Sequence, residues 1–133
     1  AFVRNPFDRF ISYCAFMLRG GDGFQQQPRE VMRHFLFGDP PEHHVLFRPQ
    51  ASLLVGEDGD TLLTDMIGRV EDMQASFDAI CGCIGIPSRS LERVNGSRHG
   101  DYRHYYDQAL IDAVAARYAR DLELFGYSFE GMR

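Results

Sequence analysis

Hydrophobic residues recur every three or four positions along several stretches of this chain, which is the spacing of an α-helix that buries one face. The first such stretch begins after Asn5 and Pro6 and ends before the glycine-rich turn at 20–23. Asn5 is a favourable N-cap, Pro6 suits the first helical turn, and Asp8 complements the helix dipole. The apolar face is predicted to hold Phe7, Phe10, Ile11, Cys14, Met17 and Leu18, and the opposite face Arg9, Ser12, Phe16 and Arg19.

Three further helices follow from the same spacing. A short one is expected over 28–37, another over 70–84 before Gly85, and a last one over 107–124, capped by Asp107 and ended by Gly126. The third helix is expected to bury Val70, Met73, Phe77, Ile80, Cys81 and Ile84, and the last helix Leu110, Val114, Tyr118, Leu122 and Phe125.

Short β-strands are expected between these helices. Phe2 and Val3 form the end of a buried strand, and two more short strands are predicted near 52–55 and 61–67 with a turn at 57–60. The pattern therefore predicts a helix-rich α/β fold. With 133 residues and 44% hydrophobic content, the chain fits a single domain over 1–133.

The charged residues of the chain exclude some classes of function. A net charge of −5 argues against nucleic acid as a partner. All 14 basic residues are arginine, so neither a Schiff base nor a phosphate-loop lysine can come from these residues. No apolar run is long enough for a membrane span. The 3 cysteines lie in apolar contexts that suit a reducing cytoplasm, where we expect the protein to be located.

Metal binding is a weak interpretation of the sequence. The pair Cys81 and Cys83 has the wrong spacing for a zinc site and lacks a second pair. His43 and His44 could bind metal with His34 only if the fold brought them together, and we expect structural hydrogen bonding by His44 instead, with contact to an acceptor substrate as the alternative. We therefore expect no metal cofactor.

The turn from the first strand into the first helix carries the candidate chemistry. Arg4 stands at that turn, and Ser12 lies two helical turns later on the polar face. An arginine can bind a phosphate dianion through two hydrogen bonds, and a serine hydroxyl can add a third. The alternative is an ordinary capped helix with solvated arginines.

Residues 3–13 closely resemble the 3′-phosphate-binding segment of the sulfotransferases, which use 3′-phosphoadenylyl sulfate (PAPS). The resemblance continues in the order of the carbohydrate sulfotransferase branch and covers nearly the whole chain. It is carried downstream by residues 44–50 (HVLFRPQ), 67–73 (IGRVEDM), 94–97 (VNGS), 105–107 (YYD), Tyr118, Asp121 and 125–127 (FGY).

This resemblance implies roles for individual residues. Arg4 and Ser12 match the arginine and serine that bind the 3′-phosphate, and Arg9 matches a second arginine that could be structural. A late loop with Asn95, Ser97, Arg98 and His99 is expected over the nucleotide, with Arg98 as a further phosphate contact. Arg69 and Glu71 are expected to pair and brace the core.

The resemblance also implies a P-loop-like sulfotransferase fold that binds PAPS or adenosine 3′,5′-bisphosphate (PAP) and transfers a sulfuryl group to a hydroxyl, expected to be that of a carbohydrate. The family's phosphate loop and catalytic base would lie before Ala1, so we expect a carboxyl-terminal portion that lacks the phosphate-loop strand, is inactive alone and self-associates as a homo-oligomer. The alternative is a catalytically silent nucleotide-binding or assembly module with the same fold.

Overall fold

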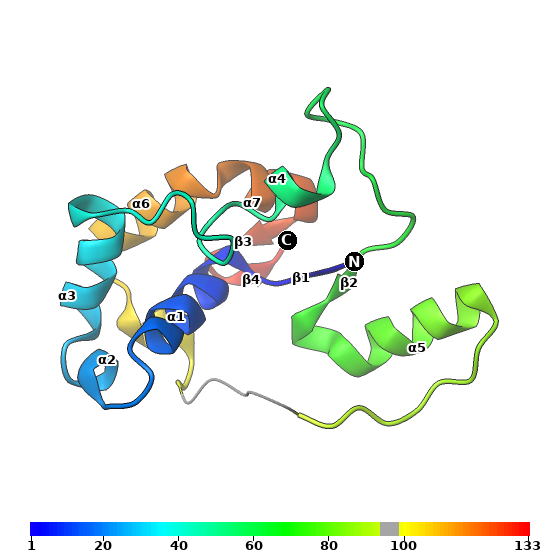
Figure 1. The fold of residues 1–133 in the computed structure, drawn as a ribbon, viewed down its shortest axis with the longest axis horizontal. Helices are drawn as coiled ribbons and strands as arrows, with labels where there is room; N and C mark the ends of the chain where they lie inside the picture. The colour runs from blue at the N-terminus through cyan, green and yellow to red at the C-terminus, as the bar shows by residue number, and fades with distance from the viewer. Residues whose placement is uncertain (94–98) are drawn as a thin grey trace. The chain divides into compact units, whose positions relative to one another are not determined.

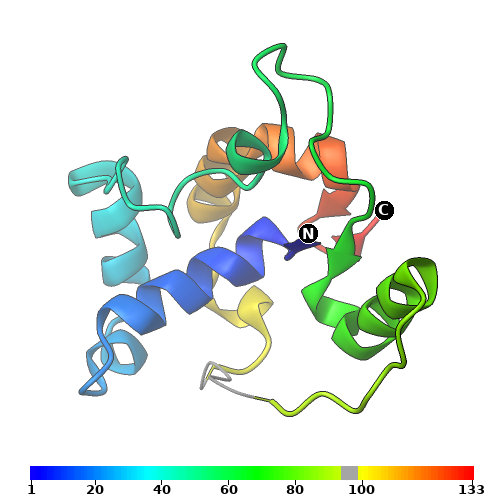
Figure 2. The ribbon, with the colours of Figure 1, turned by 45° about the vertical axis from the view of Figure 1, so that its right-hand side comes forward.

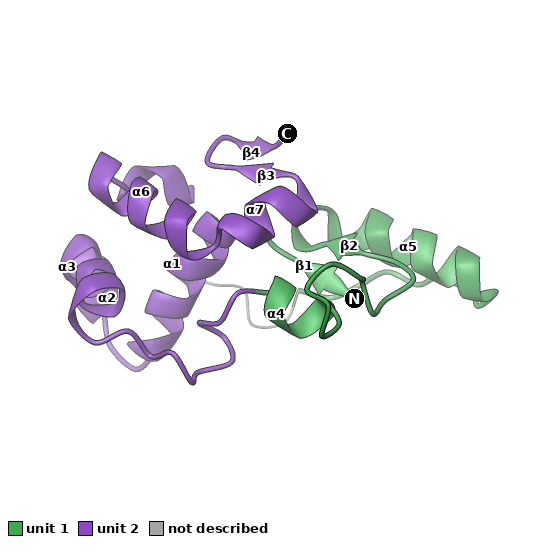
Figure 3. Ribbon diagram, turned by 90° about the horizontal axis from the view of Figure 1, so that it is seen from above, with its two compact units in different colours: residues 1–4, 50–96 green, residues 5–49, 97–133 purple. Residues whose placement is uncertain are grey.

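The computed structural model describes residues 1–93 and 99–133. The chain divides into two compact units, shown in different colours in Figure 3. Unit 1 contains Ala1–Arg4 and Gln50–Gly96, and unit 2 contains Asn5–Pro49 and Ser97–Arg133. The expectation of a single domain over 1–133 stays a prediction.

Unit 1 is built around two short parallel strands, β1 (Phe2–Val3) and β2 (Gly68–Arg69). Phe2 pairs with Gly68 and Val3 pairs with Arg69, so the ends of the two strands coincide (Figure 1). The close approach requires glycine at 68, because a Cβ there would lie 2.7 Å from the Phe2 ring. The strand that the sequence predicts at Phe2 and Val3 is confirmed, but its predicted burial holds only for Val3, since Phe2 is 38% exposed.

Helices complete unit 1 and correct part of the sequence prediction. Residues 52–55 are not a strand, because they lie mainly in the short helix α4 (Ala51–Leu54), and the strand expected at 61–67 is reduced to one bridge between Val55 and Leu62. The turn between them is confirmed: the Asp58 carboxylate accepts the Thr61 N–H at 3.0 Å, and Gly59 has a φ of +76°. Beside the bridge, the Gly56 N–H donates to the Thr61 carbonyl and the Leu63 N–H donates to the Leu54 carbonyl, each at 2.8 Å, so the two arms pair only next to the turn.

The predicted helix over 70–84 is confirmed as the 3₁₀ turn η2 (Val70–Asp72) followed by α5 (Met73–Ile84). Gly85 ends α5 in the left-handed conformation that glycine favours, with a φ of +75°. The predicted buried face is only partly correct, since Cys81 is buried whereas Ile84 is 63% exposed.

Unit 2 contains most of the helices. They are α1 (Pro6–Met17), α2 (Gly23–Gln26), α3 (Pro28–Arg33) with the π-helical turn η1 (His34–Gly38), the 3₁₀ turn η3 (Tyr102–Tyr105), α6 (Gln108–Arg117) and α7 (Ala119–Phe125). The antiparallel hairpin of β3 (Tyr127–Ser128) and β4 (Gly131–Met132) follows α7 (Figure 2). Helix α1 packs against α3, η3 and α6.

The first predicted helix is confirmed, with its N-cap. The Asn5 side chain accepts the Phe7 N–H, and Phe7, Phe10, Ile11 and Cys14 are buried. Met17 is 40% exposed and does not belong to the core, because α1 ends at that residue. Tyr13, which the sequence does not assign to the apolar face, is buried instead.

The last predicted helix is divided in two at Tyr118, whose φ of −108° and ψ of 26° interrupt the helix between α6 and α7. All five residues predicted for its inner face are buried. The phenol of Tyr118 donates to the Phe47 carbonyl at 2.7 Å. Asp107 caps α6 and Gly126 ends α7 in the left-handed conformation, as predicted.

Across the described residues the fold is a mixture of helix and strand, dominated by helices and with two small sheets. It is compatible with the α/β class. Within residues 1–93 and 99–133, no helix has both the length and the apolar character needed to cross a membrane.

Candidate phosphate-binding residues

Arg4 follows β1 at the carboxyl end of the parallel strand pair in unit 1. Its backbone is held by the side-chain amide of Gln50: the Arg4 N–H donates to Gln50 Oε1 at 2.9 Å, and Gln50 Nε2 donates to the Arg4 carbonyl at 2.9 Å. Gln50 is 8% exposed. One amide side chain thus provides the pairing that a neighbouring strand would provide, and it fixes the residue that carries the guanidinium.

Ser12 lies in the middle of α1 in unit 2, where it meets a histidine that is distant in the sequence. Ser12 Oγ is 2.8 Å from Nε2 of His99, and Nδ1 of His99 is 2.9 Å from the Gly100 carbonyl oxygen. Asp8 lies one helical turn before Ser12, and its Oδ1 is 3.7 Å from the same Nε2. Unit 2 therefore assembles a carboxylate, a hydroxyl and an imidazole around one face of α1.

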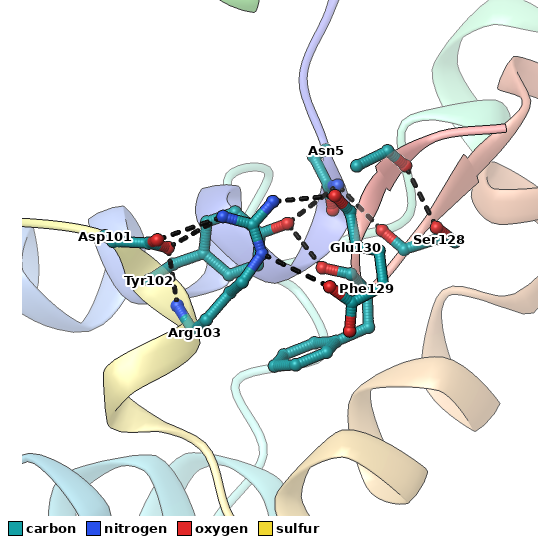
Figure 4. Close-up of polar contacts among 8 residues, drawn as sticks. Asn5, Asp101, Tyr102, Arg103, Ser128, Phe129 and Glu130 are labelled. Carbon is teal, nitrogen blue, oxygen red and sulfur yellow. Dashed lines mark hydrogen bonds and ion pairs between the residues drawn. The ribbon is translucent and has the colours of Figure 1, made fainter.

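The beginning of α1 is anchored to the carboxyl-terminal hairpin (Figure 4). The Asn5 side chain caps the helix by accepting the Phe7 N–H at 3.0 Å, and its Nδ2 donates to the Ser128 carbonyl at 2.9 Å. The Tyr102 phenol donates to the Phe129 carbonyl at 2.6 Å. These contacts hold α1, η3 and the hairpin together, and so they position Asp8 and Ser12 relative to the segment that follows residue 99.

Arg103 also contacts the carboxyl-terminal hairpin. Its guanidinium pairs with Asp101 at 3.0 Å and donates to the Glu130 carbonyl at 2.6 Å (Figure 4). The bond to Glu130 joins η3 to the hairpin, and the pair with Asp101, the N-cap of η3, is local to that turn, so Arg103 has a structural role here. Nothing in the sequence pattern distinguishes it from the other arginines.

The guanidinium of Arg9 donates hydrogen bonds to backbone carbonyls of unit 2. Its Nη1 donates to the Arg48 carbonyl at 2.8 Å, and its Nη2 donates to the Val45 carbonyl at 3.4 Å. These bonds connect α1 to the 44–50 segment, whose Phe47 is fully buried. The geometry supports the structural role that the sequence leaves open for Arg9, and a phosphate contact by Arg9 stays a prediction.

The structure pairs only some of the predicted site residues. It brings Ser12 together with His99, an approach of residues 87 positions apart that no local sequence signal reveals. Arg4 belongs to unit 1 and Ser12 and Arg9 to unit 2. Arg98, Asn95 and Ser97 lie outside the described residues.

Two other candidate groups, His44 and Cys14, have structural roles. Nδ1 of His44 accepts the Leu46 N–H at 3.3 Å, which is the structural hydrogen bonding expected for this residue. Burial raises the pKa of the Cys14 thiol well above its usual range, so this cysteine is a neutral core residue rather than a nucleophile. In the part of the chain that the structure describes, no group of three or more His, Cys, Asp or Glu side chains is arranged to hold a metal ion.

Comparison of this chain with known proteins gives no match to a family model, to a curated protein or to a solved structure.

Proposed function

We propose that this chain is part of a PAPS-dependent sulfotransferase and that it binds the 3′-phosphate of the nucleotide through Arg4 and Ser12. The acceptor in this proposal is a hydroxyl group, as on a carbohydrate. The observation that carries the proposal is the position of Arg4, directly after a strand of a parallel pair, with its backbone held on both sides by Gln50. The carboxyl ends of parallel strands are where α/β proteins bind ligands.

The chemistry of the two residues suits a phosphate. A guanidinium offers planar donors that match two phosphate oxygens, and a serine hydroxyl can donate a further bond. Gln50 belongs to the 44–50 segment of the sulfotransferase resemblance, so its contact with Arg4 joins two parts of that pattern. The ordered succession of these motifs along the sequence supports the family assignment.

The 133 residues contain no lysine, and within residues 1–93 and 99–133 no glycine-rich phosphate loop follows a strand. The proposal therefore assigns to this chain the binding of the nucleotide's 3′-phosphate, and assigns sulfuryl transfer to the whole protein. The catalytically silent nucleotide-binding or assembly module is the second candidate function, and the absence of lysine favours it. An assay of sulfate transfer from PAPS to hydroxyl acceptors, with this chain and with any longer form, separates the two.

Isothermal titration tests the binding site directly. PAP should bind more tightly than adenosine 5′-monophosphate, which lacks the 3′-phosphate. Arg4→Ala should lower PAP affinity about 10-fold to about 100-fold, because a hydrogen bond to a charged group contributes about 1.5–3 kcal/mol. Ser12→Ala should cost less, about 2-fold to about 10-fold.

Arg89→Ala is the matched control, since Arg89 is an exposed arginine of unit 1 whose backbone carbonyl accepts from Gln74 Nε2, a bond that the substitution can keep. It should leave PAP affinity unchanged. Equal affinity for the two nucleotides, or an Arg4→Ala variant that binds PAP as well as the original chain does, rejects the proposed site.

A further inference from the structure

Residues 53–63 of unit 1, called here the acidic hairpin, expose leucine beside carboxylate. Leu53 and Leu63 are 46% and 67% exposed, although a bridge joins the two arms that carry them. A Cβ at Gly56 would lie 3.6 Å from Cδ2 of Leu63 and 3.4 Å from Oδ1 of Asp58. The exposed leucine and the exposed carboxylate therefore lie against the same point of the backbone.

The acidic hairpin lies in a stretch of chain with one sign of charge. Residues 49–68 contain four acids and no basic residue, and Glu57, Asp58 and Asp60 lie in the exposed turn. Hydrogen bonds from the Thr61 hydroxyl foremost, and from backbone N–H groups, lower the pKa of Asp58, so its carboxylate is charged at neutral pH. Exposed leucine next to negative charge favours a partner that is both apolar and basic.

Residues 43–48 of unit 2, called here the basic loop, present the opposite combination. Val45 and Leu46 are 53% and 44% exposed, and Arg48 is exposed as well. The loop contains no acid. This chain therefore carries both an acidic and a basic surface, and each of them includes exposed aliphatic side chains.

Contacts within unit 2 hold the basic loop in a fixed shape. Phe47 anchors it, with a fully buried side chain and a carbonyl that accepts from the Tyr118 phenol at 2.7 Å. Arg9 donates to two backbone carbonyls of the loop, at 2.8 Å and 3.4 Å, and so adds a second guanidinium to this surface. Glu42, just before the loop, is paired with Arg117 at 2.8 Å. A surface that is ordered in advance loses less conformational entropy when a partner binds.

We propose that the acidic hairpin of one copy of this chain docks on the basic loop of a second copy, with Leu63 against Val45 and Leu46, and Glu57 beside Arg48. In a symmetric pair of copies the contact is made twice, because each copy contributes one hairpin and one loop. Pairing of hairpin with hairpin is opposed by like charges, and so is pairing of loop with loop. Dimerisation through these surfaces gives a physical basis to the expected self-association and is independent of nucleotide binding.

Sedimentation equilibrium of the full chain, from about 1 µM to about 100 µM, tests for the dimer. The original chain should dimerise, and raising the salt concentration from about 0.05 M to about 0.5 M should weaken dimerisation, because salt screens exposed charges. Leu63→Ser should raise the dimer dissociation constant about 10-fold or more, since the leucine side chain is buried at both contacts. A chain that stays monomeric over this range overturns the inference, and the acidic hairpin then belongs to an interface with a different basic protein.

Two charge reversals test which surfaces meet. Glu57→Arg and Arg48→Glu should each raise the dissociation constant about 10-fold or more, because each variant dimer places like charges together at both contacts. When the two variants are mixed in equal amounts they should associate again, since both contacts of the mixed pair join opposite charges. Variants that stay monomeric in the mixture, or a single reversal that leaves dimerisation unchanged, contradict the proposed docking.

Glu92→Arg and Arg133→Glu are the matched controls, because they make the same changes of charge at exposed positions outside the acidic hairpin and the basic loop. Both should keep the dissociation constant of the original chain, and circular dichroism checks that every variant is folded. If the controls weaken dimerisation as much as Glu57→Arg and Arg48→Glu do, the association depends on net charge and not on this contact, and the inference is wrong.

Discussion

The side chain of Gln50 forms two 2.9 Å hydrogen bonds with the backbone of Arg4, one to its N–H and one from its carboxamide to the Arg4 carbonyl. This pairing joins residues 46 positions apart and closes the end of β1 where the strand pairing with β2 stops. Gln50 therefore positions Arg4 without contacting its guanidinium in either bond.

Replacing Gln50 should affect both stability and binding. Gln50→Ala should lower the free energy of unfolding by about 1–3 kcal/mol, because two partly buried bonds are lost, and it should also weaken PAP binding. Urea unfolding and calorimetry measure the two effects. Gln26→Ala, an exposed position in unit 2, should change stability by less than about 0.5 kcal/mol. Unchanged stability in Gln50→Ala contradicts the role assigned to this pairing.

Gly68 and Gly82 should respond in opposite directions to alanine. A Cβ at Gly68 meets the Phe2 ring at 2.7 Å and Ser76 Cβ at 3.0 Å, so Gly68→Ala should cost about 1–3 kcal/mol of stability. A Cβ at Gly82 in α5 meets nothing within 4 Å, so Gly82→Ala should add about 0.5–1 kcal/mol. Thermal unfolding compares the two variants.

A second substitution identifies the clash. Phe2→Ala combined with Gly68→Ala should destabilise the chain by less than the sum of the two single effects, because the ring that obstructs the new methyl group is gone. Strict additivity in this cycle argues that the strand pairing does not require the close approach of Phe2.

The two functions of Asn5 can be separated by its substitutions. Asn5→Ala should cost about 1–2 kcal/mol, because it removes the cap of α1 and the bond to Ser128. Asn5→Asp keeps an acceptor for the Phe7 N–H but cannot donate to the Ser128 carbonyl. Hydrogen exchange should therefore show a protected Phe7 amide in Asn5→Asp, together with faster exchange in β3 and β4. Equal exchange of the hairpin in the original chain and in Asn5→Asp would falsify the proposed anchor.

The ionised carboxylate of Asp107 should make the free energy of unfolding depend on pH. The Leu110 N–H bond foremost, together with the nearby Arg33 and Arg29, lowers the pKa of Asp107 below its ordinary value. A carboxyl with a lowered folded-state pKa contributes stability that is present above its ordinary value and is lost as pH falls through the lowered one.

Asp107→Asn keeps a capping oxygen and removes only the charge. It should therefore be less stable than the original chain at pH 7, and the difference should disappear below about pH 3 in urea unfolding. A difference that persists at low pH assigns the effect to the cap geometry and not to the charge.

Local sequence signals predicted the helices well because their causes are local. Asn5, Asp107, Gly85 and Gly126 end or begin helices through their own side chains or through a left-handed backbone. The buried face of the last helix follows from helical spacing alone. The strands predicted at 52–55 and 61–67 failed because short apolar runs do not distinguish strand from helix, and tertiary contacts decide between them.

The sequence by itself determined the helix ends at Asn5, Gly85, Asp107 and Gly126, the passage from β1 into α1, and the choice of Arg4 and Ser12 as candidates for binding phosphate. Only the tertiary structure decided which side chains hold those residues: Gln50 at the backbone of Arg4, and His99 with Asp8 around Ser12. The reason is physical. Caps and helical faces depend on neighbours within a turn of the chain, whereas a hydrogen bond between distant residues depends on the path of the whole backbone, which no local spacing encodes.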